Sequence, residues 1–359
     1  MSYDVAIKSG ILIFPLVLLI LFIPYLISQY HKYGSVYWYR ALILFSFLLY
    51  LIIAYFLVIM PLPTIEEVLS LKTPQIRLEP FAFVIDFIKE SGFDINDFST
   101  YFKSFTTSSF YVPVFNIILF IPLGIYLHYY FTFSLKKTIL LSFLLSLFFE
   151  LTQLTGLYFI YPRSYRLFDI DDLILNTFGG FVGYYLGNYF IKFLPTKEKI
   201  NAKSLQLAQK VSFVRRIIAF LIDIFIILFL TNLISKNNYL LFSLLYFGLL
   251  PLILKSQTLG MRFVHLKIVS IKKDSINWYQ YILRFSLLLL EFLGPTICIS
   301  FLLKKFYNYL GTTYLFIGIC LSIFIILFYA LIILKLLLHK YLFYEIISNT
   351  KVVNTKYEI

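Results

Sequence analysis

Nine long apolar runs constrain this chain more than any other feature, because each approaches the length of a membrane-spanning helix. A helix needs about 20 predominantly apolar residues to cross the hydrocarbon core of a bilayer. The runs predict an all-α fold, a polytopic integral membrane helical bundle of about nine transmembrane helices in two modules. Some runs are short or contain proline, which leaves eight or ten spans as alternatives. They cover residues 11–28, 40–61, 113–131, 138–157, 173–192, 215–234, 239–254, 284–303 and 314–337.

The composition supports a membrane environment and argues against a soluble domain. Hydrophobic residues make up 60% of the chain and charged residues 14%, whereas soluble domains are about half apolar and about a quarter charged. The net charge of +13 would suit nucleic acid, but the Lys and Arg residues lie between the apolar runs, where they anchor a protein at an anionic membrane surface. We therefore expect membrane lipid as a partner and no nucleic acid.

The distribution of Lys and Arg predicts the orientation, because these residues are enriched in cytoplasmic segments. With the N-terminus outside and the C-terminus cytoplasmic, 21 of the 31 basic residues fall on the inside. Residues 62–112 then form an outside segment with seven acidic and four basic residues. Lys304 and Lys305 disagree with this assignment. A polar, Lys-rich stretch at 193–214 predicts a cytoplasmic linker between two membrane modules, residues 1–192 and 215–359.

The outside segment contains one amphipathic stretch, "FAFVIDFIKES". Helical periodicity places Phe81, Val84, Ile85 and Ile88 on a single face. Two interpretations are open. The stretch is either a helix that lies on the outer membrane surface or a small helix packed within the loop.

The densest group of polar residues lies at the start of the fifth apolar run. Asp169, Asp172 and Asn176 are spaced i, i+3, i+7, which places them on one helical face. Asp169 and Asp171 also lie where the start of a helix favours negative charge, so part of the group is explained by helix capping. Glycines follow the group, and we expect them to allow close packing of a neighbouring helix. They are Gly179, Gly180, Gly183 and Gly187.

Glu150 is not explained by capping. It lies thirteen residues after Lys137, which places it about 20 Å from the inner edge of its helix. A carboxylate at this depth is costly and marks a functional site by default. We expect Arg163 and Arg166 to lie just above the group and to neutralise its carboxylates. The predicted cluster in the outer leaflet comprises Asn116, Glu150, Gln153, Asp169, Asp172 and Asn176.

Two interpretations of this cluster are open. Each polar group could satisfy another in a purely structural network, because buried polar groups must be paired. The cluster could instead form a ligand-binding or catalytic site that faces the exterior.

The segment from Asn116 to Gly187 resembles the VanZ family. Its elements follow the patterns "N-x-x-x-F-x-P-x-G", "E-x-x-Q" and "R-x-x-D-x-x-D-x-x-x-N-x-x-G". The "RLEPF" segment is similar to the family's "N-L-I-P-F", with Glu79 in place of an apolar residue. The resemblance implies a bacterial plasma-membrane protein, whose founding relatives lower susceptibility to teicoplanin-type lipoglycopeptides. The matching residues are Asn116, Phe120, Pro122, Gly124, Glu150, Gln153, Arg166, Asp169, Asp172, Asn176 and Gly179.

The second module contains two further carboxylates inside apolar runs. Arg216 and Asp223 are seven residues apart, as are Arg284 and Glu291. Asp223 and Glu291 are expected to face the interior of the bundle, where they could share a proton, a cation or a basic partner. Hydrogen bonding between helices and an ion path are equally compatible with this pattern.

A short strand is predicted between these runs, because Val264, Leu266 and Ile268 alternate with other residues. With a turn at "KKDS" it would form a hairpin at the cytoplasmic surface. The polar C-terminal segment "NTKVVNTKYEI" is expected to be loosely ordered.

The second module resembles the RDD family in three elements, namely "R-x-x-A-x-x-I-D" from Arg216 to Asp223, "Q-T-L-G" from Gln257 and "T-x-V-V" from Thr350. Where that family carries "H-D", this chain has His339 followed by Lys340. The resemblance implies a membrane module with transport or partner-interaction roles, and the missing aspartate puts any role that depends on it in doubt.

Three functions compete at this point. The first is a non-enzymatic envelope factor whose cluster binds an amphiphile, such as a lipoglycopeptide, or a lipid-linked cell-wall precursor. The second is an intramembrane enzyme with Glu150 as general base and Asp169 and Asp172 as possible metal ligands, although no nucleophile–base pair is present in the pattern and no His lies near. The third is transport through Asp223 and Glu291. We favour the first, and expect no cofactor and no metal site. The pattern leaves the oligomeric state open.

Overall fold

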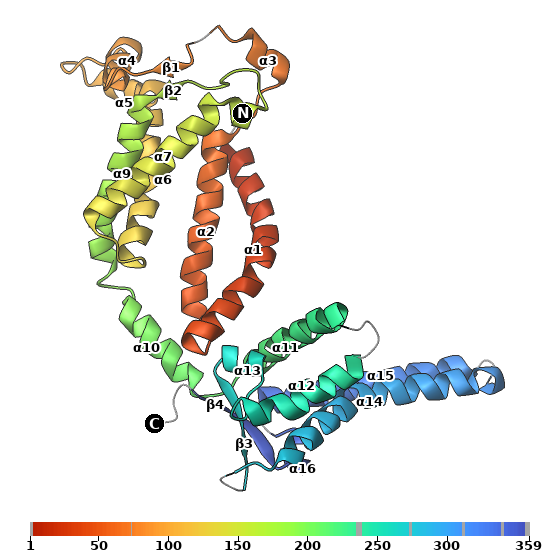
Figure 1. Ribbon diagram of the computed structural model, residues 1–359. Coiled ribbons are helices and arrows are strands. Elements are labelled where there is room, and N and C mark those ends of the chain that lie inside the picture. The colour runs from red at the N-terminus through yellow and green to blue at the C-terminus, as the bar shows by residue number, and fades with distance from the viewer. Residues whose placement is uncertain are drawn as a thin grey trace. The chain divides into compact units, whose positions relative to one another are not determined.

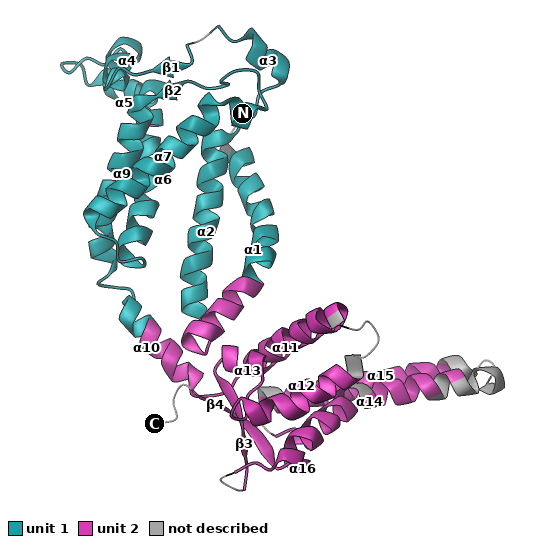
Figure 2. Ribbon diagram, viewed as in Figure 1, with its two compact units in different colours: residues 1–22, 38–200 teal, residues 23–37, 201–359 magenta. Residues whose placement is uncertain are grey.

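The computed structural model describes residues 3–72, 74–234, 239–272, 275–310, 313–338 and 341–355. It divides into two compact units (Figure 2). Unit 1 comprises Met1–Phe22 and Trp38–Ile200, and unit 2 comprises Ile23–Tyr37 and Asn201–Ile359. The polar stretch 193–214 contains a helix, α10 (Lys197–Ala208), and the division between the units falls inside it.

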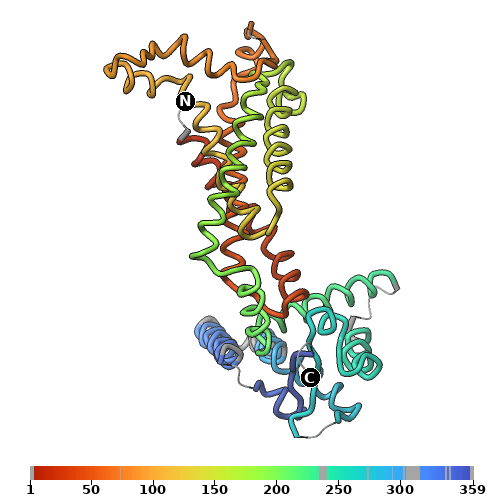
Figure 3. Tube along the Cα trace, turned by 90° about the vertical axis from the view of Figure 1, so that its left-hand side faces the viewer, coloured from red at the N-terminus to blue at the C-terminus, as the bar shows by residue number. Residues whose placement is uncertain are grey.

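Unit 1 is built on five long helices that run side by side, the first of which continues beyond Phe22 into unit 2 (Figures 1–3). They are α1 (Tyr3–Tyr33), α2 (Trp38–Ile59), α6 (Ser108–Tyr129), α7 (Leu135–Leu154) and α9 (Ile170–Phe190). Short elements gather at one end of these helices (Figure 1). They are α3 (Ile65–Ser70), α4 (Ala82–Ser91), α5 (Ser99–Phe105), α8 (Gly156–Phe159) and the strands β1 (Ile76–Arg77) and β2 (Phe168–Asp169).

The two short strands decide which side chains meet at that end. β1 and β2 pair in parallel, with Ile76 opposite Phe168 and Arg77 opposite Asp169. The pairing joins the long loop before α4 to the segment that leads into α9. It therefore places the Arg77 guanidinium beside the first polar residue of α9.

Glycines allow α6 and α9 to pack with their backbones in contact. A Cβ atom added to Gly179 would lie 2.2 Å from the Ile117 carbonyl oxygen, and one added to Gly183 would lie 2.1 Å from the Ile121 carbonyl oxygen. These distances are far below van der Waals contact, so a side chain at either position would push the helices apart. The predicted packing role of these glycines is confirmed.

Unit 2 combines helices with a small antiparallel sheet (Figure 1). Its helices are α11 (Phe213–Ile234), α12 (Tyr239–Ile253), α13 (Leu259–Phe263), α14 (Trp278–Leu310), α15 (Thr313–Leu337) and α16 (Phe343–Ile347). Its strands are β3 (Leu266–Ser270) and β4 (Thr350–Asn354), paired with Leu266 opposite Asn354 and Ser270 opposite Thr350.

The predicted strand is confirmed, but its predicted partner is wrong. Leu266 and Ile268 alternate with less buried residues as expected. β3 pairs with the C-terminal β4 and not with a neighbour across the "KKDS" turn, of which residues 273–274 lie outside the described part of the chain. The C-terminal segment is therefore ordered over Thr350–Asn354. The physical reason is its own alternation, which buries Val352 against Leu266 and Val264.

The prediction of an all-α, polytopic membrane protein is confirmed, because each of the nine apolar runs coincides with a helix and several of these helices are long enough to cross a membrane. Among the described residues, five helices are long and apolar enough to cross a membrane: Asp4–Tyr33, Trp38–Ile59, Ser108–Tyr129, Leu135–Leu154 and Phe316–Lys335. A sixth is added if the two parts of α14, bent by 49°, form one span. The remaining predicted spans correspond to α9 and α11, which carry several polar residues, and to the shorter α12.

Candidate functional site

Buried polar side chains meet at the start of α9, as the sequence predicts. Glu150, on α7, is 2% exposed. Its Oε2 atom accepts a hydrogen bond of 3.0 Å from the Asp169 backbone N–H. Asp169 in turn caps α9, because its Oδ1 accepts from the Asp171 N–H over 3.0 Å. Glu150 thus points into the bundle at the first turn of α9, and Asp172 and Arg166 lie close enough to interact with it electrostatically.

A second set of bonds connects α6 and α7 to the same turn. Asn116 Nδ2 donates to Asp172 Oδ1 over 2.6 Å. Asn176 Nδ2 donates to Ser146 Oγ over 2.9 Å, and Ser146 Oγ donates to the Asp172 carbonyl oxygen over 3.3 Å. Three helices therefore contribute to one network. We call it the acidic cluster, with the members Asn116, Ser146, Glu150, Asp169, Asp172 and Asn176.

The other predicted members donate hydrogen bonds to backbone carbonyl groups, and Arg166 interacts with the carboxylates of Glu150 and Asp172 electrostatically without a salt bridge to them. Arg166 Nη1 and Nη2 donate to the carbonyl oxygens of Val58 and Met60, each over 2.6 Å. Gln153 Nε2 donates to the same Val58 oxygen over 3.0 Å, and Arg163 Nη1 donates to the Leu71 carbonyl. The last carbonyls of a helix have no partner within the helix, and Arg166 and Gln153 satisfy those at the end of α2.

Among the described residues, Arg77 is the cation that forms a salt bridge with the acidic cluster, and the sequence motifs do not single it out. Its Nε and Nη2 both donate to Asp169 Oδ2, the former over 3.0 Å. Its Nη1 donates to Asp86 Oδ2 over 2.7 Å. These hydrogen bonds, above all those to Asp169, raise the pKa of the Arg77 guanidinium above its ordinary value. The signal in the sequence was a lone arginine directly before the "LEPF" element of an acidic loop.

Asp171 ties the short helix α4 to α9 and was likewise missed as a functional residue. It is 1% exposed. Its Oδ1 accepts from the Phe81 N–H over 2.6 Å and its Oδ2 from the Phe83 N–H over 2.9 Å. Phe81, at the start of α4, has a left-handed backbone conformation and its side chain makes no cap hydrogen bond. Asp171 therefore supplies from a distant segment the acceptors that the N-terminus of α4 requires.

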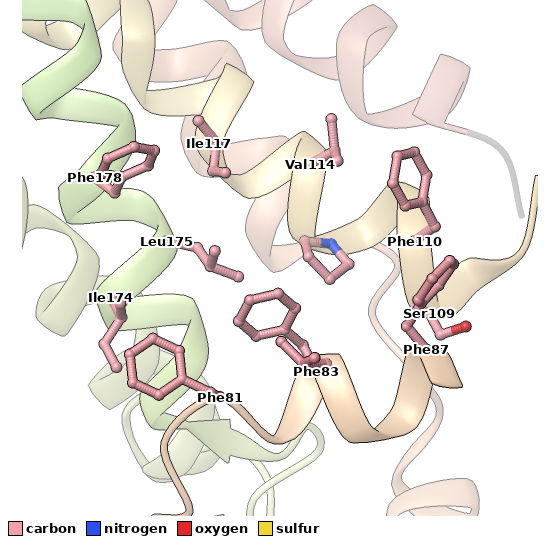
Figure 4. Close-up of a pocket in the computed structure, with 12 residues that line it drawn as sticks. Phe81, Phe83, Phe87, Ser109, Phe110, Val114, Ile117, Ile174, Leu175 and Phe178 are labelled. Atoms are coloured by element: carbon pink, nitrogen blue, oxygen red, sulfur yellow. The ribbon is translucent and has the colours of Figure 1, made fainter. Parts of the chain in front are cut away.

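An apolar pocket of about 480 Å³ lies between α4, α6 and α9 (Figure 4). Phe83 and Phe87 of α4, Ile117 of α6 and Leu175 and Phe178 of α9 all line it. We call it the α4 pocket. In the predicted amphipathic helix, Phe81 and Val84 also line the pocket and are 58% and 42% exposed. Ile85 and Ile88 are outside its lining and are 53% and 62% exposed.

The α4 pocket is built together with the polar residues at the start of α9. Asp171 shares one face of α9 with Leu175 and Phe178, at spacings of four and seven residues. Ile117 directly follows Asn116 on α6. The carboxylate that holds α4 in place therefore lies on the same face of α9 as two residues of the pocket wall. Such an arrangement suits a molecule with an apolar chain and a polar head.

The described residues of unit 1 and unit 2 contain no set of side chains arranged to bind a metal ion. None of their His, Cys, Asp and Glu side chains form a group of three or more that could hold an ion. Two acceptor atoms of Asp171 and one oxygen of Glu150 are already occupied by backbone N–H groups.

The polar residues of the second module form two separate groups. Asp223 is 1% exposed, so its predicted position in the interior is confirmed. It accepts from Thr258 Oγ1 and Tyr246 Oη over 2.6 Å each and from the Gly260 N–H over 2.7 Å. The two motifs that suggested the RDD resemblance thereby meet, because Thr258 and Gly260 belong to "Q-T-L-G" and Asp223 ends "R-x-x-A-x-x-I-D".

Asp223 and Glu291 have no partner in common among the described residues, and the two arginines that precede them in the sequence bond to another carboxylate. Arg216 Nη1 donates to Glu345 Oε1 over 3.0 Å, and Arg284 Nη2 donates to the same oxygen over 3.4 Å. Glu291 instead accepts from the Phe343 and Tyr344 N–H groups, over 3.3 and 2.9 Å, at the start of α16. Glu345, which is fully buried, was missed because its two arginine partners lie at least 60 residues away. His339 and Lys340 lie outside the described residues.

Comparison with known families agrees with the arrangement suggested by the motifs. Residues 47–193 match the VanZ/LLP1 family model, and residues 238–341 match the RDD family model. The chain therefore has a VanZ-like N-terminal part and an RDD-like C-terminal part. The second match leaves out Arg216 and Asp223 and begins after α11. No curated protein and no solved structure matched the chain.

Proposed function

We propose that this multi-pass membrane protein, VanZ-like over 47–193 and RDD-like over 238–341, binds an amphiphile of the bacterial cell envelope through its VanZ-like part. The binding site is the α4 pocket together with the acidic cluster. It faces the exterior of the plasma membrane, with the N-terminus outside and the C-terminus cytoplasmic. The role is binding and not catalysis, and its outcome is lower susceptibility to teicoplanin-type lipoglycopeptides.

The observation that carries this proposal is the apolar α4 pocket beside the buried carboxylates of α9. Its volume of about 480 Å³ falls in the range of small-molecule sites, which are about 300–1,000 Å³. A chain that arrives from water would gain about 0.8 kcal/mol for each CH₂ group it buries. A chain that arrives from the bilayer would gain little from transfer, since lipid tails are equally apolar. The pocket therefore favours an amphiphile captured from the aqueous side.

The charges around the pocket favour a head group that carries an amine. Asp86 and Asp169 share the single guanidinium of Arg77, which leaves an excess of negative charge at the start of α4 and α9. Asp86 and Arg77 remain 38% and 30% exposed at their side chains, so a ligand can reach them. An ammonium group would relieve the imbalance.

The experiment compares a pocket-filling variant with its lipid-facing neighbour. Ile117 lines the α4 pocket, whereas the adjacent Ile118 is 54% exposed. Cells producing wild type, Ile117→Trp or Ile118→Trp are tested for the minimal inhibitory concentration of a lipoglycopeptide and of its non-lipidated relative. We expect wild type and Ile118→Trp to protect against the lipidated drug alone, and Ile117→Trp to lose that protection at equal membrane abundance.

Two results would contradict the proposal. Protection by Ile117→Trp equal to that of wild type would separate the pocket from the function. An unchanged inhibitory concentration in cells producing wild type would remove the lipoglycopeptide from the proposal.

A further inference from the structure

Unit 2 contains a pocket of its own, with a volume of about 380 Å³. It lies between α11 and α14 and also touches α12, α13, α16, β3 and β4. Its walls are mainly apolar and aromatic, with Phe220 from α11, Phe285 and Leu289 from α14 and Leu266 from β3. We call it the α11–α14 pocket.

The pocket is elongated along α14. The residues of α14 that line it begin at Tyr281 and end at Phe292 and follow helical spacing along one face. At 1.5 Å per residue this stripe is about 16 Å long. The volume lies at the lower end of the range for ligand sites. Both features suit one extended alkyl chain better than the two chains of a phospholipid.

Most polar groups that line the pocket are already engaged. Both oxygens of Asp223 accept hydrogen bonds, one from Thr258 and the other from Tyr246 and the Gly260 N–H. Arg284 donates to Thr350 Oγ1 over 2.7 Å, and its guanidinium stacks on the Tyr344 ring at 4.7 Å. A ligand would find neither a free carboxylate here nor a free Arg284.

Arg216 is different, because most of its donors are unused. It lines the pocket, and its side chain is 24% exposed. Among the described residues its guanidinium makes one hydrogen bond, from Nη1 to Glu345. The edge formed by Nε and Nη2 is thus available. That edge presents two parallel N–H donors, the arrangement that binds a carboxylate at both oxygens.

The salt bridges of the two arginines favour the same ligand. Arg216 and Arg284 share the single carboxylate of Glu345. Glu291 is directed to the backbone N–H groups of α16 and does not pair with either arginine. The two guanidinium groups therefore have one carboxylate in contact between them, and the apolar wall of the pocket begins beside Arg216.

From this geometry we infer that the RDD-like part binds a long-chain carboxylate, a fatty-acid anion, with its carboxylate on the Nε/Nη2 edge of Arg216 and its chain along α14. The inference is independent of the amphiphile proposed for the α4 pocket, because every residue that carries it lies in unit 2.

The test uses the purified full-length protein and two photoreactive probes. One probe is a C16 fatty acid with a diazirine in its chain, and the other is the C16 alcohol with the same diazirine. Labelling is measured at pH 8, where the acid is ionised, and labelled peptides are mapped by mass spectrometry. We expect labelling within α11 and α14, about tenfold stronger for the acid, and displaced by unlabelled palmitate.

Variants separate the contribution of the charge from that of the cavity. Arg216→Gln should bring labelling by the acid down to that of the alcohol. Arg216→Lys keeps the charge without the two parallel N–H donors, so its labelling by the acid should lie between that of wild type and that of Arg216→Gln. Leu289→Trp should fill the cavity and reduce labelling by both probes. Leu290→Trp is the matched control, because the adjacent Leu290 is 61% exposed and lies outside the pocket.

The inference is overturned if wild type labels equally with acid and alcohol, if the labelled peptides lie outside α11 and α14, or if a folded Arg216→Gln keeps the preference for the acid. Should Arg216→Gln fail to fold, the comparison of Leu289→Trp with Leu290→Trp decides. Equal labelling of these two variants would then reject the pocket, and a loss restricted to Leu289→Trp would support it.

Discussion

Asp171 illustrates how one residue can be essential to the site without contacting a ligand. Its carboxylate accepts two backbone N–H groups at the start of α4, and the loss of a buried hydrogen-bond partner costs about 1–3 kcal/mol. We expect Asp171→Ala to release α4 from α9 while α9 itself stays helical. Hydrogen exchange should then increase over residues 82–91.

The control for this prediction is Glu90→Gln, which changes an exposed acid in the same helix. Exchange over 82–91 should be unchanged in that variant. Equal protection of α4 in Asp171→Ala and wild type would show that other contacts hold the helix.

Glu150 and Asp172 allow the charge of the cluster to be tested separately from its folding. In Glu150→Gln the side-chain oxygen can still accept from the Asp169 N–H, and in Asp172→Asn it can still accept from Asn116. We expect both variants to reach the membrane in normal amounts and to lose protection against a lipoglycopeptide. Inhibitory concentrations and immunoblots of membranes provide the measurement.

Asp223→Asn serves as the comparison, because Asp223 lies in unit 2. It should keep the protection. Loss of protection only in Asp223→Asn would favour transport through the second module, and a fall in the abundance of the cluster variants would make the cluster structural.

At the scale of elements, the contact of α6 with α9 depends on the absence of side chains. Gly179→Ala places a methyl group 2.2 Å from the Ile117 carbonyl oxygen, which is backbone and cannot rotate away. We expect the two helices to separate and the thermal unfolding temperature to fall by several degrees. Gly318→Ala is the control, because an added Cβ there meets no atom within 4 Å. Equal unfolding temperatures for both variants would contradict the predicted contact.

The strand β4 is a second element whose contribution can be isolated. Val352 is only 6% exposed and packs with Val264 and Leu266, whereas Val353 lies on the opposite face of the strand. Burial of an amide without a partner costs about 1–3 kcal/mol, so Val352→Asn should make β3 and β4 more accessible to protease than Val353→Asn does. If both variants were cleaved at the same rate, the strand would not be part of the core.

The whole molecule combines two units that each hold their own polar groups and their own pocket. The proposed orientation can be tested with a cysteine-free variant, in which Cys298 and Cys320 are replaced. A cysteine introduced at exposed Asn96 should react with a membrane-impermeant maleimide on intact cells, and one at exposed Lys203 should react only after lysis. Labelling in the opposite pattern would reverse the orientation and place the α4 pocket on the cytoplasmic side.

Local patterns were sufficient for much of this description. The apolar runs identified the long helices, because the backbone N–H and C=O groups of a span must form hydrogen bonds within the helix while its apolar side chains face lipid or the bundle. Helical spacing brought Asp169, Asp172 and Asn176 to one face, and the depth of Glu150 along α7 indicated that it points into the bundle. These inferences succeeded because they depend on periodicity within single elements.

Tertiary structure decided the partners. Arg77 and not Arg166 pairs with Asp169, Glu345 joins Arg216 and Arg284, and β4 replaces the expected local hairpin. Each of these contacts joins residues at least 60 positions apart, and their chemistry alone allowed several pairings. Only the packing of helices and the register of two short sheets select among such pairings. A buried charged group needs a partner, and the fold decides which one lies within hydrogen-bond distance.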